Sequence, residues 1–80
     1  MRMKKKNVTI SDFNIATCLC VSGANLLYLD RTNPKRVRFV FEDEELFHRI
    51  MKAYWDRSLS YSPQDLFEGH RELKNRLYNE

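Results

Sequence analysis

The sequence predicts a small α+β domain in which a first helix is followed by an antiparallel β-hairpin and then by two more helices. Three observations predict this class: residues 11–23 enclose an apolar interior between helix-start and helix-stop residues, two later segments alternate with period two across a turn, and the last two segments repeat apolar residues at helical spacing. The 80 residues, 42% of them hydrophobic with only two Gly and two Pro, suffice for one thin core.

Residues 11–23 are expected to form the first helix. Ser11 is the expected N-cap, Asp12 lies in the first turn where a negative charge favours the helix dipole, and Gly23 is the expected stop. Apolar residues occupy nearly every side of this segment, which indicates a helix at the centre of the domain. Apolar and polar residues alternate just before it, so a short strand is expected over residues 7–10.

Residues 26–32 and 37–42 are expected to pair as a β-hairpin, because both segments alternate with period two. The connection over residues 33–36 places Pro34 at the first central position of a turn. In the second strand the residues expected to face inward are Val37, Phe39 and Phe41, and those on the opposite face are Arg38, Val40 and Glu42. A bare two-stranded ribbon is seldom stable, so either the strand over residues 7–10 or a homodimer is expected to supply more burial.

Two helices are expected to follow and to pack on one face of the hairpin. The acidic residues 42–45 begin the first of them, which runs to Arg57, because negative charges stabilise a helix N-terminus. The last helix begins with Ser62 as N-cap and Pro63 at the first helical position. Gly69 in its middle indicates a close approach by another element. The expected apolar stripe of this helix is Leu66, Phe67, His70, Leu73, Leu77 and Tyr78.

Motifs for enzymes and metal centres are missing from the sequence. The two glycines form no phosphate-binding loop, and Cys18 and Cys20 give neither a disulfide framework nor a paired zinc-ligand set. We therefore expect no cofactor, no metal and no catalytic residue, unless a pocket joins a cysteine to His48 or His70. No apolar run approaches the roughly 20 residues of a membrane span, so a cytoplasmic protein that does not enter the membrane is expected.

Basic residues concentrate in the first half of the chain. Residues 1–41 carry eight Lys and Arg against two acids, a net charge of +6, whereas residues 42–80 carry six bases and nine acids, a net charge of −3. Residues 1–6 are expected to form a flexible basic arm before a single domain over residues 7–80. A basic ribbon and arm can contact DNA grooves and phosphates, so a nucleic-acid-binding module is predicted. The cations expected at one end of the molecule are Lys4, Lys5, Lys6, Arg31, Lys35, Arg36 and Arg38.

Two other interpretations of the surface residues stay open. Charged hairpin tips also protect sheet edges from pairing with other chains, and the inward-facing phenylalanines are not available to stack on bases, which leaves Tyr28 and Tyr61 as the exposed aromatic residues expected. Aromatic residues beside acidic ones can instead form a protein-interaction or inhibitory surface. The residues of that alternative surface are Glu42, Glu44, Glu45, Trp55 and Tyr61.

The order of several short sequences resembles that of a known family. They are Asp12-Phe13 and Ile15-Ala16 in the first helix, Arg38-Phe39-Val40-Phe41-Glu42-Asp43 at the end of the hairpin, Tyr54-Trp55, and Glu72-Leu73-Lys74-Asn75-Arg76-Leu77-Tyr78. Over about residues 8–78 the chain resembles a family of short prokaryotic and phage-related domains of unknown function. The resemblance implies a bacterial or phage protein that acts by binding nucleic acid or by interfering with a host complex, and it transfers no catalytic residue.

Overall fold

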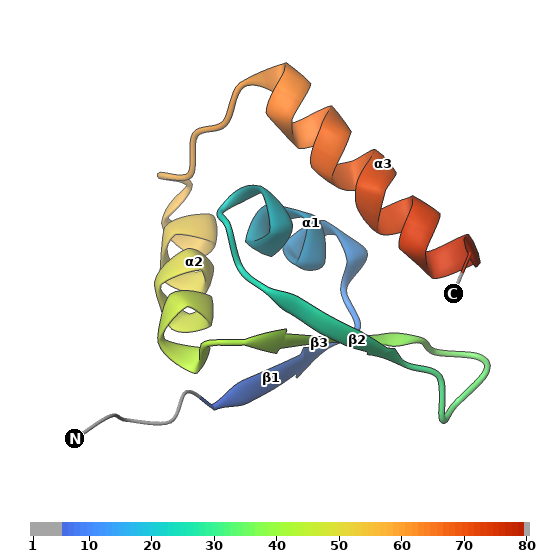
Figure 1. Ribbon diagram of the computed structural model, residues 1–80. Helices are drawn as coiled ribbons and strands as arrows, with labels where there is room; N and C mark the ends of the chain where they lie inside the picture. Colours follow the sequence, from blue (N-terminus) through green and yellow to red (C-terminus); the bar gives the residue numbers. More distant parts are fainter. Residues whose placement is uncertain (1–5, 80) are drawn as a thin grey trace.

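Three strands and three helices follow one another along the chain (Figure 1), and the computed structural model describes residues 6–79. In order they are β1 (Asn7–Ile10), α1 (Phe13–Val21), β2 (Leu26–Asp30), β3 (Arg38–Glu42), α2 (Glu44–Asp56) and α3 (Pro63–Asn79). The α+β class is confirmed, and the strand expected over residues 7–10 is present. Each helix within residues 6–79 is too short or too polar to cross a bilayer.

The middle strand of the sheet is β3, and both β1 and β2 run antiparallel to it. The two outer strands are therefore parallel to each other, and α1 connects them. Across the sheet, Phe39 pairs with Ile10 of β1 and with Leu29 of β2, while Phe41 pairs with Val8 and Leu26. These pairs give one apolar face, because residues directly opposite each other in an antiparallel ladder share a face.

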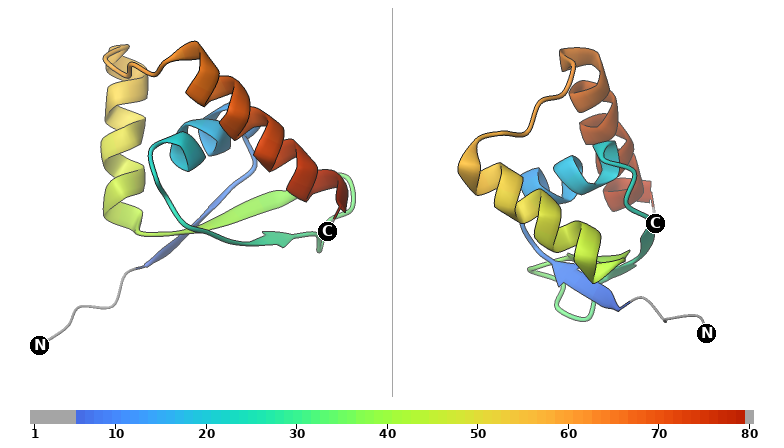
Figure 2. Two further views of the ribbon diagram at one scale, coloured as in Figure 1. Left: turned by 45° about the horizontal axis from the view of Figure 1, so that its top comes forward. Right: turned by 90° about the vertical axis from the view of Figure 1, so that its left-hand side faces the viewer.

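All three helices lie on that apolar face of the sheet, and the opposite face carries no helix (Figures 1 and 2). The buried residues packed between sheet and helices are Ile10, Ala16, Leu19, Phe39, Phe41 and Leu73. Phe39 and Phe41 are 2% and 0% exposed, so their predicted inward orientation is confirmed. The sheet thus forms one outer layer of the molecule, with a face left open to solvent.

The first helix begins one residue later than expected. Asp12, not Ser11, is the N-cap, because its extended backbone lets the carboxylate accept the N–H of Ile15 at 3.1 Å. The predicted stop is confirmed: Gly23 has a φ of 93°, a conformation that favours glycine, and its N–H donates to Cys20.

The second helix is tied to the entry of β1 through Asp43. This residue has a φ of 84° and caps α2 by accepting the N–H of Leu46 at 3.1 Å. The backbone N–H groups of Asp43 and Glu44 both donate to the carbonyl of Lys6 at 3.0 Å. The start of α2 and the start of β1 therefore hold each other in place.

Replacing Asp43 with alanine is expected to lower the free energy of unfolding by about 1–2 kcal/mol. Alanine removes the capping carboxylate and also tolerates the left-handed backbone less well than aspartate does. Asp43→Asn keeps a capping oxygen and a side chain common at such positions, so it is the matched control and is expected to stay close to the native stability. Urea unfolding followed by circular dichroism measures both variants, and equal stabilities for them would contradict this role of the cap.

The third helix starts as predicted, but its buried side is narrower than the predicted stripe. The Ser62 hydroxyl accepts the N–H of Asp65 at 3.1 Å, yet only Gly69 and Leu73 are buried along α3. The prediction is wrong for Phe67 and Tyr78, which are 66% and 73% exposed, and also for Leu66 and His70, which are exposed too. The cause is that α3 packs mainly along α1, so a narrow line of contact is enough.

Gly69 marks the closest approach of the two helices. A Cβ atom at this position would lie 2.5 Å from Cγ2 of Val21 on α1, which is far inside van der Waals contact. The close approach predicted from a mid-helix glycine is therefore confirmed, and it explains why the helix accepts a residue that costs about 1 kcal/mol relative to alanine.

Candidate nucleic-acid interface

The tip of the hairpin is held by a local turn. The carbonyl of Asn33 accepts the N–H of Arg36, and its side-chain oxygen accepts the N–H of Lys35, both at 3.0 Å. Pro34 restricts φ at the first central position, as expected for this turn. The turn holds Lys35 and Arg36 at the exposed end of the ribbon.

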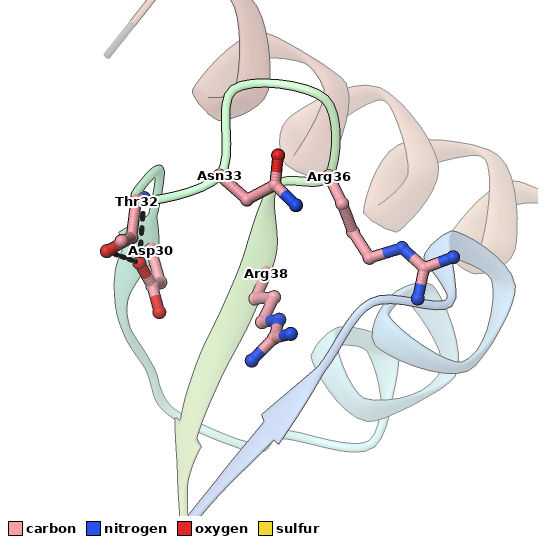
Figure 3. Close-up of a pocket in the computed structure, with 5 residues that line it drawn as sticks. All are labelled: Asp30, Thr32, Asn33, Arg36 and Arg38. Carbon is pink, nitrogen blue, oxygen red and sulfur yellow. Dashed lines mark hydrogen bonds between the residues drawn. The ribbon is translucent and has the colours of Figure 1, made fainter.

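A cavity of about 180 Å³ lies beside this turn (Figure 3). Arg36 lines it from the loop and Arg38 from β3, while Asp30 comes from β2 directly opposite Arg38, and the Arg36 side chain extends away from those of Arg38 and Asp30 (Figure 3). Thr32 and Asn33 complete the lining. A strand end and a connecting loop therefore bring two arginine residues to the lining of one small hollow.

Among residues 6–79, Asp30 is the only acidic group that lines this cavity, and its carboxylate is already engaged. One of its oxygens accepts the hydroxyl of Thr32 at 2.6 Å and the backbone N–H of Thr32 at 2.9 Å. The hydroxyl bond, the backbone bond and the nearby charge of Arg38 lower the pKa of Asp30 from its ordinary value, so it is ionised at neutral pH. Two guanidinium groups against one carboxylate leave the cavity with a net positive charge, which favours an anionic ligand.

Three of the predicted cations gather at this end of the hairpin, namely Lys35, Arg36 and Arg38. All three are exposed. Arg31 has another position, because its guanidinium donates to the carbonyl of Leu77 near the end of α3. It joins the hairpin to the last helix in the way that basic groups commonly bind helix C-termini.

The predicted N-terminal cations do not join this group within the described chain. Asn7 pairs with Glu42 and Ile10 with Phe39, so β1 starts at the end of the sheet away from the hairpin tip. Lys6 lies at that far end, and the expectation that it would meet the hairpin cations is wrong. Lys4 and Lys5 of the predicted flexible arm lie outside the described residues.

Of the two tyrosines expected to be exposed, one is exposed and the other is engaged in hydrogen bonds. Tyr28 is 54% exposed, as expected, and it pairs with Val40 on the sheet face that carries no helix. Tyr61 is not free, because its hydroxyl donates to the carbonyl of Cys18 at 3.2 Å and is hydrogen-bonded to the hydroxyl of Ser22. Tyr61 thus fixes the connection between α2 and α3 against the end of α1.

The residues predicted for a protein partner are spread over both ends of α2, the end of β3 and the connection before α3. Glu44 and Glu45 lie in the first turn of α2, whereas Trp55 lies near its end, about 16 Å away along the helix axis. Trp55 is 71% exposed and packs its ring edge-to-face with Tyr54 at a centroid distance of 5.4 Å. Glu42 instead ends β3, where its carboxylate accepts the Asn25 amide at 3.5 Å.

An enzymatic function was expected only if a pocket joined a cysteine to a histidine. A second cavity, of about 270 Å³ between the helices, is lined by both Cys18 and His70. Burial and then the charge of Asp12 raise the pKa of Cys18, which keeps the thiol protonated at neutral pH. His70 packs edge-to-face on the ring of Phe13 at 4.8 Å, and within residues 6–79 no hydrogen bond joins it to the thiol. The pair lacks the geometry and the lowered pKa of a cysteine nucleophile.

The other cysteine is also an ordinary thiol. Burial raises the pKa of Cys20 to about 11, with a further increase from the charge of Glu72. Among the residues that the structure describes, no group of three His, Cys, Asp or Glu side chains is arranged to hold a metal ion.

Sequence reasoning did not identify three residues of the hairpin cavity, namely Asp30, Thr32 and Asn33. Thr32 is two residues after Asp30, which is the spacing at which an aspartate accepts the N–H of a following residue, and Asn33 precedes Pro34, a common turn-forming pair. Both patterns involve residues that are close in the sequence, so they can be recognised from the sequence alone. They indicate the turn, but the cavity depends on the pairing of Asp30 with Arg38 across two strands.

Comparison with known proteins identifies the family. The family model described as a domain of unknown function, DUF5659, matches residues 5–79. No curated protein and no solved structure matches the chain. The match covers almost the whole chain and confirms the resemblance to a family of domains of unknown function, so this protein belongs to the DUF5659 family.

Proposed function

We propose that this protein is a small, non-enzymatic cytoplasmic binding module that contacts nucleic acid through its basic hairpin. The observation that carries the proposal is the positively charged cavity formed by Arg36 and Arg38 next to exposed Lys35. Among residues 6–79 no hydrogen bond to another side chain holds either of the two guanidinium groups. They are therefore available to a phosphate, whereas Arg31 is engaged with α3.

The shape of the hairpin also suits a polyanion. The three cations lie at the end of the molecule where the ribbon extends past the helices (Figure 1), so an extended backbone can approach without meeting the acidic start of α2. Phosphate contacts of this kind release condensed counterions, which makes the binding weaken as salt is added.

Binding of short labelled DNA and RNA tests the proposal by fluorescence anisotropy at several salt concentrations. Arg36/Arg38→Ala is expected to weaken binding and to lower the slope of log affinity against log salt by about 1.4–1.8, since each lost phosphate contact contributes about 0.7–0.9. Asp30→Asn is expected to strengthen binding, because it removes the carboxylate charge and leaves an oxygen to accept the Thr32 groups.

The matched control is Arg49/Lys52→Ala, which removes the same charge from exposed positions on α2, at the other end of the sheet. It is expected to bind nearly as well as the native protein. If both double variants weaken binding equally, the interaction depends on net charge rather than on the hairpin, and the proposed site is wrong. If the folded native protein binds no nucleic acid at low salt, the proposed function is wrong.

A second candidate function, a protein-interaction or inhibitory module, is favoured by one surface. Trp55 and Phe67 are 71% and 66% exposed, and Tyr54 contacts Trp55 and lines the cavity between the helices together with Phe67. Such aromatic residues suit a homodimer or the binding of a host protein by a phage or mobile-element accessory protein. This interaction would show little dependence on salt, so the same titrations distinguish the two functions.

A further inference from the structure

The face of the sheet without helices has a composition of its own. Pairing of Tyr28 with Val40 and of Asp30 with Arg38 places these four residues on one face, away from the core pairs formed by Phe39 and Phe41. The residues of this open face are Asn7, Thr9, Tyr28, Asp30, Arg38, Val40 and Glu42. It is a polar surface with a single aromatic ring, which lies on the outer strand β2.

The Tyr28 side chain is largely open to solvent. Its side chain is 54% exposed, and within the described residues no hydrogen bond or ring contact engages it. Its neighbour Val40 is only 4% exposed although no helix covers it, so the side chains around it on the sheet provide the cover. The ring of Tyr28 is therefore the exposed apolar group on an otherwise polar face.

Tyr28 and the hairpin cavity are adjacent on this face. Asp30 is two positions after Tyr28 along β2, a distance of about 7 Å in an extended strand, and Asp30 lies opposite Arg38 in the cavity. An aromatic ring thus lies on the same face as Arg38, beside a cavity that Arg36 also lines from the loop. Stacking on a ring combined with basic groups along the backbone is the arrangement that binds single-stranded nucleic acid, because an unpaired base exposes its flat face.

The distribution of charge limits which part of the open sheet face a nucleic acid can contact. Arg38 and Arg36 lie at the hairpin end, whereas Glu42 lies at the opposite end of the same strand. A phosphate backbone is attracted to the first end and repelled from the second. A duplex cannot use the ring in the same way, since its bases are stacked on one another and their faces are closed.

We infer that the hairpin half of the open sheet face binds single-stranded nucleic acid, with one base stacked on Tyr28 and a neighbouring phosphate in the cavity of Arg36 and Arg38. This inference rests on the proposed function. It adds that the bound nucleic acid is single-stranded and that Tyr28 is the residue that selects it over a duplex. Because the ring stacks without reading base edges, the binding is expected to depend little on sequence.

The test measures affinity for three labelled probes of equal length: oligo-dT, oligo-rU and a DNA duplex. Tyr28→Ala is expected to weaken binding of the single strands about tenfold or more and to leave the duplex affinity and the salt slope unchanged. Tyr28→Phe keeps the ring and is expected to bind like the native protein. Tyr78→Ala removes another exposed tyrosine, 73% exposed on α3, and serves as the control.

Each outcome decides between the two proposals. If the native protein prefers single strands and only Tyr28→Ala removes that preference, the inference is supported. If Tyr28→Ala binds single strands as tightly as the native protein while Arg36/Arg38→Ala does not, the inference is wrong and the proposed function stands. Tighter binding of the duplex than of either single strand also overturns the inference, and absence of binding to every probe overturns both.

Discussion

Replacing Phe41 with alanine is expected to lower the free energy of unfolding by about 3–5 kcal/mol, because the change removes a fully buried ring and leaves a cavity. Phe41 is 0% exposed and lies on the middle strand, where it pairs with Val8 of β1 and Leu26 of β2. Both outer strands therefore lose contacts at once. No other position of the sheet combines a side chain of this size with such complete burial.

The loss is large compared with the whole stability of the domain. An 80-residue protein has a free energy of unfolding of about 4–12 kcal/mol, so Phe41→Ala is expected to leave a measurable unfolded population without denaturant. Urea titration monitored by circular dichroism measures the effect. Phe41→Leu retains most of the volume and is the control, expected to cost clearly less. An unfolding midpoint for the alanine variant equal to the native one would contradict the described core.

Leu73→Ala is expected to cost about 2–5 kcal/mol and to loosen α3 before the rest of the protein. Leu73 is 1% exposed, and apart from Gly69 it is the residue of α3 that is buried. The helix otherwise has exposed apolar residues such as Phe67. Removing the leucine therefore takes away the main apolar attachment of α3 to α1 and the sheet.

Hydrogen exchange measured by mass spectrometry separates local loosening from global unfolding. Amide groups of α3 are expected to exchange faster in Leu73→Ala than those of β3, because regions with few buried contacts open first. Phe67→Ala is the matched control on the same helix and is expected to change the free energy of unfolding by less than about 0.5 kcal/mol, as exposed positions do. Equal effects of the two substitutions would contradict this description of how α3 is attached.

Local patterns in the sequence predicted the features that depend on neighbouring residues. The alternation from Val37 to Glu42 gave the correct faces of β3, and Ser62 with Pro63 gave the correct start of α3. The same patterns gave the wrong buried side for α3, because the width of a buried stripe depends on what lies against the helix. Phe67 is apolar and correctly spaced, but no element of the fold covers it.

The candidate site was predictable to the extent that it lies within one turn. Lys35, Arg36 and Arg38 are close in sequence, and the turn at Pro34 keeps them together. The position of Lys6 depended on the antiparallel pairing of β1 with β3, more than thirty residues later in the chain. The engagement of Arg31 likewise depended on where the last helix ends. Such distant pairings have no signal in the spacing of neighbouring residues.

The position of β3 between two strands that precede it has a consequence for how the protein forms during synthesis. When the ribosome has made only residues 1–37, β1 and β2 are complete but have no strand to pair with, since each pairs with β3. The sheet can form only when β3 emerges, and it then forms on both sides together. A chain divided at the hairpin tip would yield two pieces, neither containing a pair of strands that can join. The sheet would therefore form only when the two pieces associate. Residues 33–36 are thus a suitable place to split the protein into two fragments whose association can be detected by the formation of the sheet.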